Sequence, residues 1–330
     1  MKTFEVGELH PNTPHLFADL AELLLLVGYN GRTKIHSNDL EKLLNDKTIN
    51  SDELDGEEEA QQAETSSASI NSRQDRQIED VLIQLSYRSG AFADWYPFSL
   101  NGDTLCVSTN LNEKQRVYRH MLACSRLRSF GTSGLPQRWA KVFTRVAKLA
   151  FEGLAPPKAV TRIFDANSDD RKAYYGTDLR QALPILGKDL GISINERNCN
   201  KANASGDAGF DLVANLDFDD GAAITFSLLG QCGAQETNWP SKTLEAHSIQ
   251  LRHLFQVQFE YPSVMMTPVC FRTADGEWVD DKCSNGIFLA DRSRILQLID
   301  SQQCVQNLVS QNWFIDFEAE FNQFTPESNN

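Results

Sequence analysis

The stretch that decides the fold runs from Ser205 to Lys242 and reads SGDAGFDLVANLDFDDGAAITFSLLGQCGAQETNWPSK. Within it, two runs of β-favouring residues, FDLVANLDF and AAITFSLLG, flank the tripeptide DDG. Asp-Gly tolerates the positive φ angles of a tight turn, so this pattern predicts a β-hairpin. A two-residue loop places Asp211 opposite Gly230, whereas a one-residue bulge places it opposite Gln231.

Both registers bring the carboxylate of Asp211 beside the backbone that follows the second strand. A carboxylate and a peptide carbonyl are oxygen ligands that suit Mg²⁺. We therefore expect a divalent metal held by Asp211 and by the backbone carbonyl of Cys232. Glu236, in the loop after the hairpin, is the candidate for a second acidic ligand, and the alternative is an ordinary solvated carboxylate.

The segments SGDAGFDLV and LLGQCG resemble the core of the Mrr-type restriction endonucleases, a branch of the PD-(D/E)XK superfamily. The family pattern is a helix, then Gly-Asp-Gly-Gly-hydrophobic-Asp, a hairpin and Gln-x-Lys, and the resemblance covers about residues 177–272. It implies that Asp211 is the metal-binding aspartate and Gln231 the family's catalytic glutamine. Asp207 matches the aspartate of the turn, which more often shapes the loop than binds metal.

The sequence departs from this pattern in two places. Gly233 stands at the position of the catalytic lysine, and it offers no side chain to orient a water or to stabilise phosphorane charge. We expect Lys242, at the start of the following helix, to fill that role, with Trp239 packing the loop. The family's supporting glutamate aligns near Arg180, where Asp178 is the closest carboxylate.

A basic segment, residues 114–149, contains nine Lys or Arg and no Asp or Glu. Helices predicted over about 112–129 and 135–151 would place its charges on stripes, because side chains three or four residues apart share a helix face. The expected contacts to a nucleic-acid backbone are Arg116, Arg119, Arg126, Lys141, Arg145 and Lys148. The alternative is that both stripes are solvated faces of ordinary packing helices.

Composition limits the function further. The formal net charge of −14 argues against general nucleic-acid affinity, because phosphate binding needs Lys and Arg. The first residues resemble no signal peptide, and the longest apolar run, Leu23 to Val27, is too short to span a bilayer. We therefore expect a cytoplasmic protein with no membrane partner. The seven scattered cysteines predict free thiols and no zinc site or disulfide framework.

We expect four segments along the chain. These are a helical segment over 1–45, an acidic disordered linker over 46–75, a basic helical domain over 76–160 and a PD-(D/E)XK-like nuclease domain over 161–330. In the last segment, the order of helix, hairpin, helix, strand and strand suits a mixed sheet flanked by helices. The predicted fold class is therefore α/β (α+β), with a helical N-terminal region.

The resemblance implies a metal-dependent endonuclease that uses Mg²⁺ or Mn²⁺, with Asp211, Gln231 and Lys242 as catalytic residues. It favours DNA as substrate and bacterial restriction or antiphage defence as the setting. An ATPase or sensor subunit would be a separate partner protein, since the chain has no Walker A pattern. The alternatives are a catalytically inactive nuclease fold that binds nucleic acid or a partner, and a docking subunit of a larger assembly.

Overall fold

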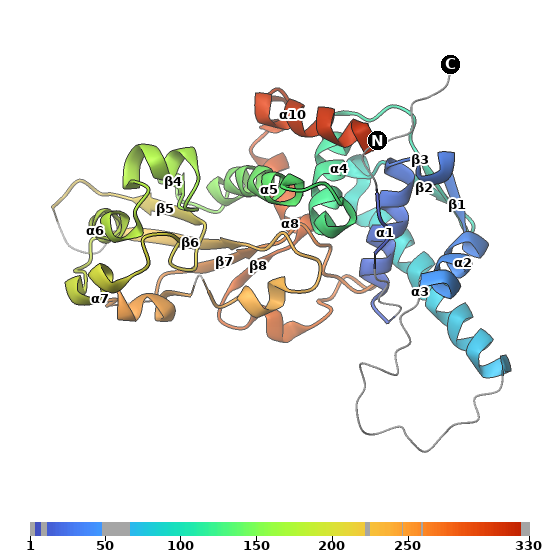
Figure 1. The fold of residues 1–330 in the computed structure, drawn as a ribbon, viewed down its shortest axis with the longest axis horizontal. Coiled ribbons are helices and arrows are strands. Elements are labelled where there is room, and N and C mark those ends of the chain that lie inside the picture. Colours follow the sequence, from blue (N-terminus) through green and yellow to red (C-terminus); the bar gives the residue numbers. More distant parts are fainter. Residues whose placement is uncertain are drawn as a thin grey trace. The chain divides into compact units, whose positions relative to one another are not determined.

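The computed structural model describes residues 4–7, 12–47, 67–221, 225–245, 247–258 and 260–324. Two compact units form (Figure 1): unit 1 comprises Met1–Pro136, Cys270–Val279 and Val309–Asn330, and unit 2 comprises Gln137–Val269 and Asp280–Leu308. The predicted boundary at residue 160 therefore differs from the observed one. Two segments of the predicted nuclease domain belong to unit 1 instead, because they pack with its residues.

The predicted linker over 46–75 lies partly outside the described residues. At its ends the prediction of disorder is wrong, because residues 46–47 close one helix and residues 67–75 begin another. The helices and strands of unit 1 are α1 (Pro14–Leu26), β1 (Lys34–His36), α2 (Ser37–Lys47), α3 (Ser67–Phe92), β2 (Phe98–Asn101), β3 (Thr104–Val107), α4 (Glu113–Ser125) and α10 (Asn312–Phe321). The three strands form an antiparallel sheet in the order β1-β3-β2.

Helix α1 is buried along nearly its whole length, including two carboxylates. Arg88 of α3 lies 2.7 Å from Asp19 and 2.9 Å from Glu22, and none of the three side chains is exposed. The hydroxyls of Tyr96 and Tyr118 each donate to Glu22 at 2.8 Å. Buried charges need partners of this kind, so the network fixes how α1, α3 and α4 pack within unit 1.

Unit 2 is built on a five-stranded mixed sheet in the order β4-β5-β6-β7-β8, whose strands lie side by side in Figure 1. Strands β4, β5 and β6 pair antiparallel, and β6, β7 and β8 pair parallel. The predicted α/β class with a mixed sheet is thus confirmed. The elements of this unit are α5 (Leu135–Glu152), β4 (Val160–Ile163), α6 (Leu179–Asp189), α7 (Glu196–Lys201), β5 (Leu212–Leu216), β6 (Phe226–Cys232), β7 (Ser263–Met266), β8 (Phe288–Ala290), α8 (Arg292–Ser301) and α9 (Val305–Val309).

Helices cover both faces of this sheet. On one face, Leu183 of α6 belongs to the same buried core as Val213 of β5 and Leu229 of β6. On the other face, a Cβ at Gly230 would lie 2.8 Å from the ring of Phe151 in α5. Glycine is therefore needed at that strand position, because it lets α5 approach the sheet closely.

The hairpin of β5 and β6 is present, and it adopts the second of the two predicted registers. Leu212 pairs with Gly230, which places Asp211 across from Gln231. The α-helix expected to begin at Lys242 is absent from the described residues after the hairpin. Two short 3₁₀ turns, Trp239–Lys242 and Ser248–His253, stand in its place. All seven cysteines are free thiols, as the sequence predicts.

Candidate metal centre

Three aspartates meet at the edge where β4 ends and β5 begins. Asp165 follows β4, Asp207 lies in the turn before β5, and Asp211 directly precedes β5. Ile163 of β4 pairs with Leu212 of β5, so the end of one strand adjoins the start of the other. One carboxylate oxygen from each aspartate lies within 4.8 Å of the other two, a spacing that suits one shared cation.

Asp211 is the most buried member of this aspartate cluster, at 9% exposed. The backbone N–H of Cys232 donates to its Oδ2 atom at 2.9 Å. Burial first, and then the charge of Asp207, raise the pKa of Asp211 to about 7. Three carboxylates this close repel one another, so the cluster stays folded by holding a proton or by binding a cation.

Asp207 shapes its loop and also belongs to the cluster. Its Oδ1 atom accepts a hydrogen bond from the N–H of Gly209 at 3.0 Å. Gly209 has a φ of +92°, and a Cβ there would lie 3.1 Å from the carbonyl oxygen of Glu245. Glycine is needed at this point because both the backbone angle and the close approach exclude a side chain.

Arg171 connects the two loops that carry Asp165 and Asp207. Its guanidinium is fully buried, and Nη1 donates to the carbonyls of Phe164 at 2.8 Å and of Gly206 at 3.2 Å. Those carbonyls belong to the residues that immediately precede the two aspartates. Arg171 therefore fixes the spacing of the two loops and places a positive charge beside the cluster.

Gln231 faces a residue that the sequence did not single out. Its side chain is 4% exposed, and Nε2 donates to Oε2 of Glu245 at 3.1 Å. Its Oε1 atom is buried, with no hydrogen-bond partner among the described residues. Glu245 and Asp165 are the site residues that sequence reasoning missed. No element is predicted from the sequence next to Asp165, and the sequence carries no signal for Glu245 either.

The space of the missing lysine is filled. A Cβ at Gly233 would lie 2.3 Å from Cε of Met265 and 2.6 Å from Cβ of Trp239, which is itself 1% exposed. A side chain at this position would therefore displace the sheet core or the following turn. Lys242 lies at the end of that turn. Its charge lowers the pKa of Asp211, but its ammonium forms no ion pair at 4.0 Å or less with any residue that the structure describes.

The two other predicted metal ligands, the Cys232 carbonyl and Glu236, differ in their position relative to the aspartate cluster. The N–H of Gly233 donates to the carbonyl of Met266 in β7. Successive residues of a strand direct their N–H and C=O groups to opposite neighbouring strands, so those of Cys232 point toward β5 and Asp211. The Cys232 carbonyl therefore faces the same side as the cluster. Glu236 is 7% exposed and not an open solvated carboxylate, and it lies outside the aspartate cluster.

Asp178, the carboxylate nearest to the family's supporting glutamate, serves a local role. Its side chain accepts from the backbone N–H of Arg180 at 2.9 Å and so caps α6. Its Oδ1 atom also accepts from Nε of Arg180 at 3.0 Å. This carboxylate is committed to the helix start, and it is not part of the aspartate cluster.

The first basic stripe is paired with an acid that lies outside residues 114–149. Glu318 of α10 accepts from Nε of Arg116 at 2.8 Å and from Nη2 of Arg119 at 2.6 Å. Arg126 is 1% exposed and donates to the carbonyl of Val6 at 2.8 Å, so it cannot reach a nucleic-acid backbone. The acid that pairs with the stripe comes from a distant part of the chain, which the sequence window did not include.

The second basic stripe is also paired. Arg145 lies 3.2 Å from Asp169, and Lys148 lies 2.9 Å from Asp170. Both aspartates belong to unit 2 and follow β4. Of the six predicted contacts, Lys141 is the exposed side chain for which the described part of the chain supplies no ion pair.

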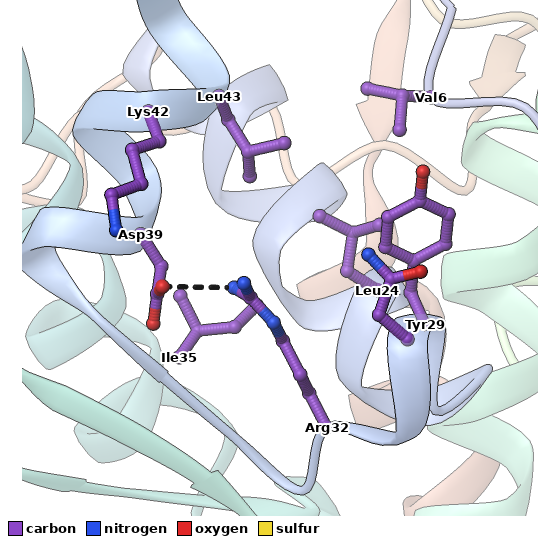
Figure 2. Close-up of a pocket in the computed structure, with 9 residues that line it drawn as sticks. Val6, Leu24, Tyr29, Arg32, Ile35, Asp39, Lys42 and Leu43 are labelled. Atoms are coloured by element: carbon purple, nitrogen blue, oxygen red, sulfur yellow. Dashed lines mark ion pairs between the residues drawn. The ribbon is translucent and has the colours of Figure 1, made fainter.

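Unit 1 contains a hollow of its own, shown in Figure 2. Leu24 and Ile35 contribute apolar surface, and Arg32 and Asp39 form an ion pair at 3.0 Å beside it. Its volume of about 200 Å³ is below the usual range for ligand pockets. The neutralised pair and the small volume make it a weaker candidate than the aspartate cluster.

Comparison of the chain with family models, with curated proteins and with solved structures found no match. Within the described ranges, no helix has the length and apolar content needed to cross a membrane.

Proposed function

We propose that unit 2 is a nuclease that hydrolyses phosphodiester bonds with Mg²⁺ or Mn²⁺ held by Asp165, Asp207 and Asp211. The observation that carries this proposal is the convergence of three carboxylate oxygens within 4.8 Å of one another. Asp211 is buried, and buried carboxylates are normally paired or coordinate a metal. A bound divalent cation would offset their repulsion, polarise a phosphoryl oxygen and lower the pKa of a bound water.

The protein groups around this cluster have separate tasks. Asp211, whose pKa is raised, would give up its proton to hold a cation, and the Cys232 carbonyl, which faces the same side, would offer a further oxygen ligand. Gln231 orients Glu245 through their hydrogen bond. Lys242 is the cation that would contact a phosphate oxygen or the attacking water, because its charge already acts on Asp211.

We further propose DNA as the substrate, restriction or antiphage defence as the setting, and an ATPase or sensor protein as the partner. These three points rest on the resemblance of SGDAGFDLV and LLGQCG to Mrr-type endonucleases. A cytoplasmic location is part of the same proposal.

A second candidate function is binding without cutting. It is favoured by one observation, namely that Met265 and Trp239 occupy the space of a side chain at Gly233. A strand lysine is therefore excluded sterically, and if Lys242 does not replace it, the fold would hold nucleic acid or a partner protein without catalysis.

The test is nicking of supercoiled plasmid with Mg²⁺ or Mn²⁺. We expect wild type to nick, and Asp211→Asn, Asp165→Asn and Lys242→Ala to lose most of that activity. Asp219→Asn is the matched control, because it removes one carboxylate from an exposed turn and because asparagine tolerates the φ of 53° there. Nicking that is equal in wild type and Asp211→Asn would refute the proposal, and no nicking by wild type would favour the binding function.

A further inference from the structure

A cavity in unit 2 opens directly beside the aspartate cluster. Its volume is about 660 Å³, and Asp207 forms part of its wall. Leu179 and Leu254, which are buried, contribute apolar surface, whereas Lys201 and His253 are exposed members of the lining. The cavity is therefore a surface groove with an apolar floor, a cationic rim and one carboxylate of the candidate metal centre at its side.

The cationic rim differs from the basic stripes of α4 and α5. Lys201 forms no ion pair within 4.0 Å of any residue that the structure describes, and the same is true of Arg197, one turn earlier on α7. Residues four apart share a helix face, so both charges lie on the same side of α7. These charges are available to an anionic ligand, whereas Arg116, Arg119, Arg145 and Lys148 are already paired with carboxylates.

His253, which lines the groove, has one ring nitrogen committed to a hydrogen bond and one that is left for a ligand. Its Nδ1 atom lies 2.6 Å from the carbonyl oxygen of Gln250, which can only accept, so Nδ1 carries a hydrogen. The other ring nitrogen, Nε2, then remains for a ligand. Asn198 donates to the carbonyl of His253 at 2.7 Å and ties α7 to this residue, so the two sides of the groove are held together.

We propose that this groove binds the nucleic-acid strand that is cut, with Lys201 contacting a phosphate next to the scissile one. This inference rests on the proposed nuclease function for the role of the aspartate cluster. This volume of about 660 Å³ lies within the usual range for ligand sites. The apolar floor of Leu179 and Leu254 contacts sugar or base, and the rim contacts phosphate. The groove therefore binds the nucleic-acid backbone without recognising the base sequence.

The first measurement is binding of a fluorescein-labelled single-stranded DNA oligonucleotide by fluorescence anisotropy, in EDTA and in the Asp211→Asn background. Cleavage cannot occur under these conditions, so binding is measured apart from catalysis. We expect Lys201→Gln to weaken binding by roughly twofold to fivefold. The slope of log affinity against log salt concentration should fall by about 0.7, because one phosphate contact is lost.

The matched control is Lys188→Gln. Lys188 is an exposed lysine in the last turn of α6, and it does not line the groove. We expect its affinity and salt slope to equal those of the parent. Because Lys201 is exposed, thermal unfolding of Lys201→Gln should match that of Lys188→Gln, which excludes misfolding as the cause.

The second measurement is plasmid nicking by Lys201→Gln with Mg²⁺, which should show a raised KM and a kcat close to that of wild type. Equal affinity of Lys201→Gln and Lys188→Gln for the oligonucleotide would overturn the proposal that the groove binds nucleic acid, even if wild type nicks. Binding that depends on Lys201 in a protein that never nicks would support the groove and contradict the nuclease proposal. The two ideas therefore fail separately.

Discussion

Replacing the buried Asp211 by asparagine should make the protein more stable at alkaline pH. Its pKa is raised from 3.8 to about 7, and it is 9% exposed, so solvent screening is slight. Since the folded state holds a proton that the unfolded chain has released, the free energy of unfolding falls as pH rises from about 4 to about 7. The difference of about three pKa units corresponds to about 4 kcal/mol.

Asparagine removes this loss because it does not titrate. It can still accept from Cys232 N–H through its amide oxygen, and its amide hydrogens can donate to Asp207 or Asp165. We expect Asp211→Asn to raise the free energy of unfolding by about 2–4 kcal/mol at pH 8 and by less than about 1 kcal/mol at pH 4.

Urea unfolding in EDTA, followed by tryptophan fluorescence, measures this difference at the two pH values. Trp139 and Trp239 of unit 2 are both buried and report its unfolding. Asp219→Asn should shift the midpoint at neither pH. A loss of stability in Asp211→Asn at pH 8, or an equal gain at both pH values, would refute the reasoning.

Three further predictions concern the same site. Mn²⁺ should raise the Tm of wild type at pH 8 but not that of Asp211→Asn, and titrations should show weaker Mn²⁺ binding below pH 7, where protons compete. Gly233→Lys should not raise nicking above that of wild type and should lose about 3 kcal/mol or more of stability in urea unfolding, because Met265 and Trp239 fill the space of its side chain. Arg171→Met should lower the free energy of unfolding by about 2–4 kcal/mol and weaken Mn²⁺ binding, measured by calorimetry, because two loop carbonyls lose their donor. A Tm rise with Mn²⁺ in Asp211→Asn, unchanged stability in Gly233→Lys, or unchanged Mn²⁺ affinity in Arg171→Met would each contradict its prediction.

Local patterns sufficed for part of the site. The hairpin follows from two β-favouring runs around Asp-Gly, and its length alone restricts Asp211 to a position opposite Gly230 or Gln231. Which of these two registers forms is seen in the pairing of Leu212 with Gly230, which the sequence does not specify. The role of Asp207 was predicted only as a loop-shaping residue, because its proximity to Asp165 depends on strand pairing across a long sequence gap.

The pairing of the basic residues, in contrast, could not be predicted from the sequence. Counting residues from 114 to 149 finds no acid, yet Glu318, Asp169 and Asp170 reach its arginines and lysines from outside that segment. Ion pairing is a through-space property, so a window along the sequence cannot decide whether a cationic stripe is open. Among the described residues, the cation that lines the groove beside the candidate metal centre without an ion pair is Lys201 of α7, a helix that no pattern in the sequence selected.

The sequence by itself therefore determined the mixed α/β fold class, the β-hairpin and the placement of Asp211 beside the end of the second strand, because these depend on alternation and turn chemistry within short segments. Only the tertiary structure decided that Asp165 completes the aspartate cluster, that Gly233 has no room for a lysine and that Glu245 meets Gln231. Each of these depends on how distant segments pack, and packing distances are set by the whole fold.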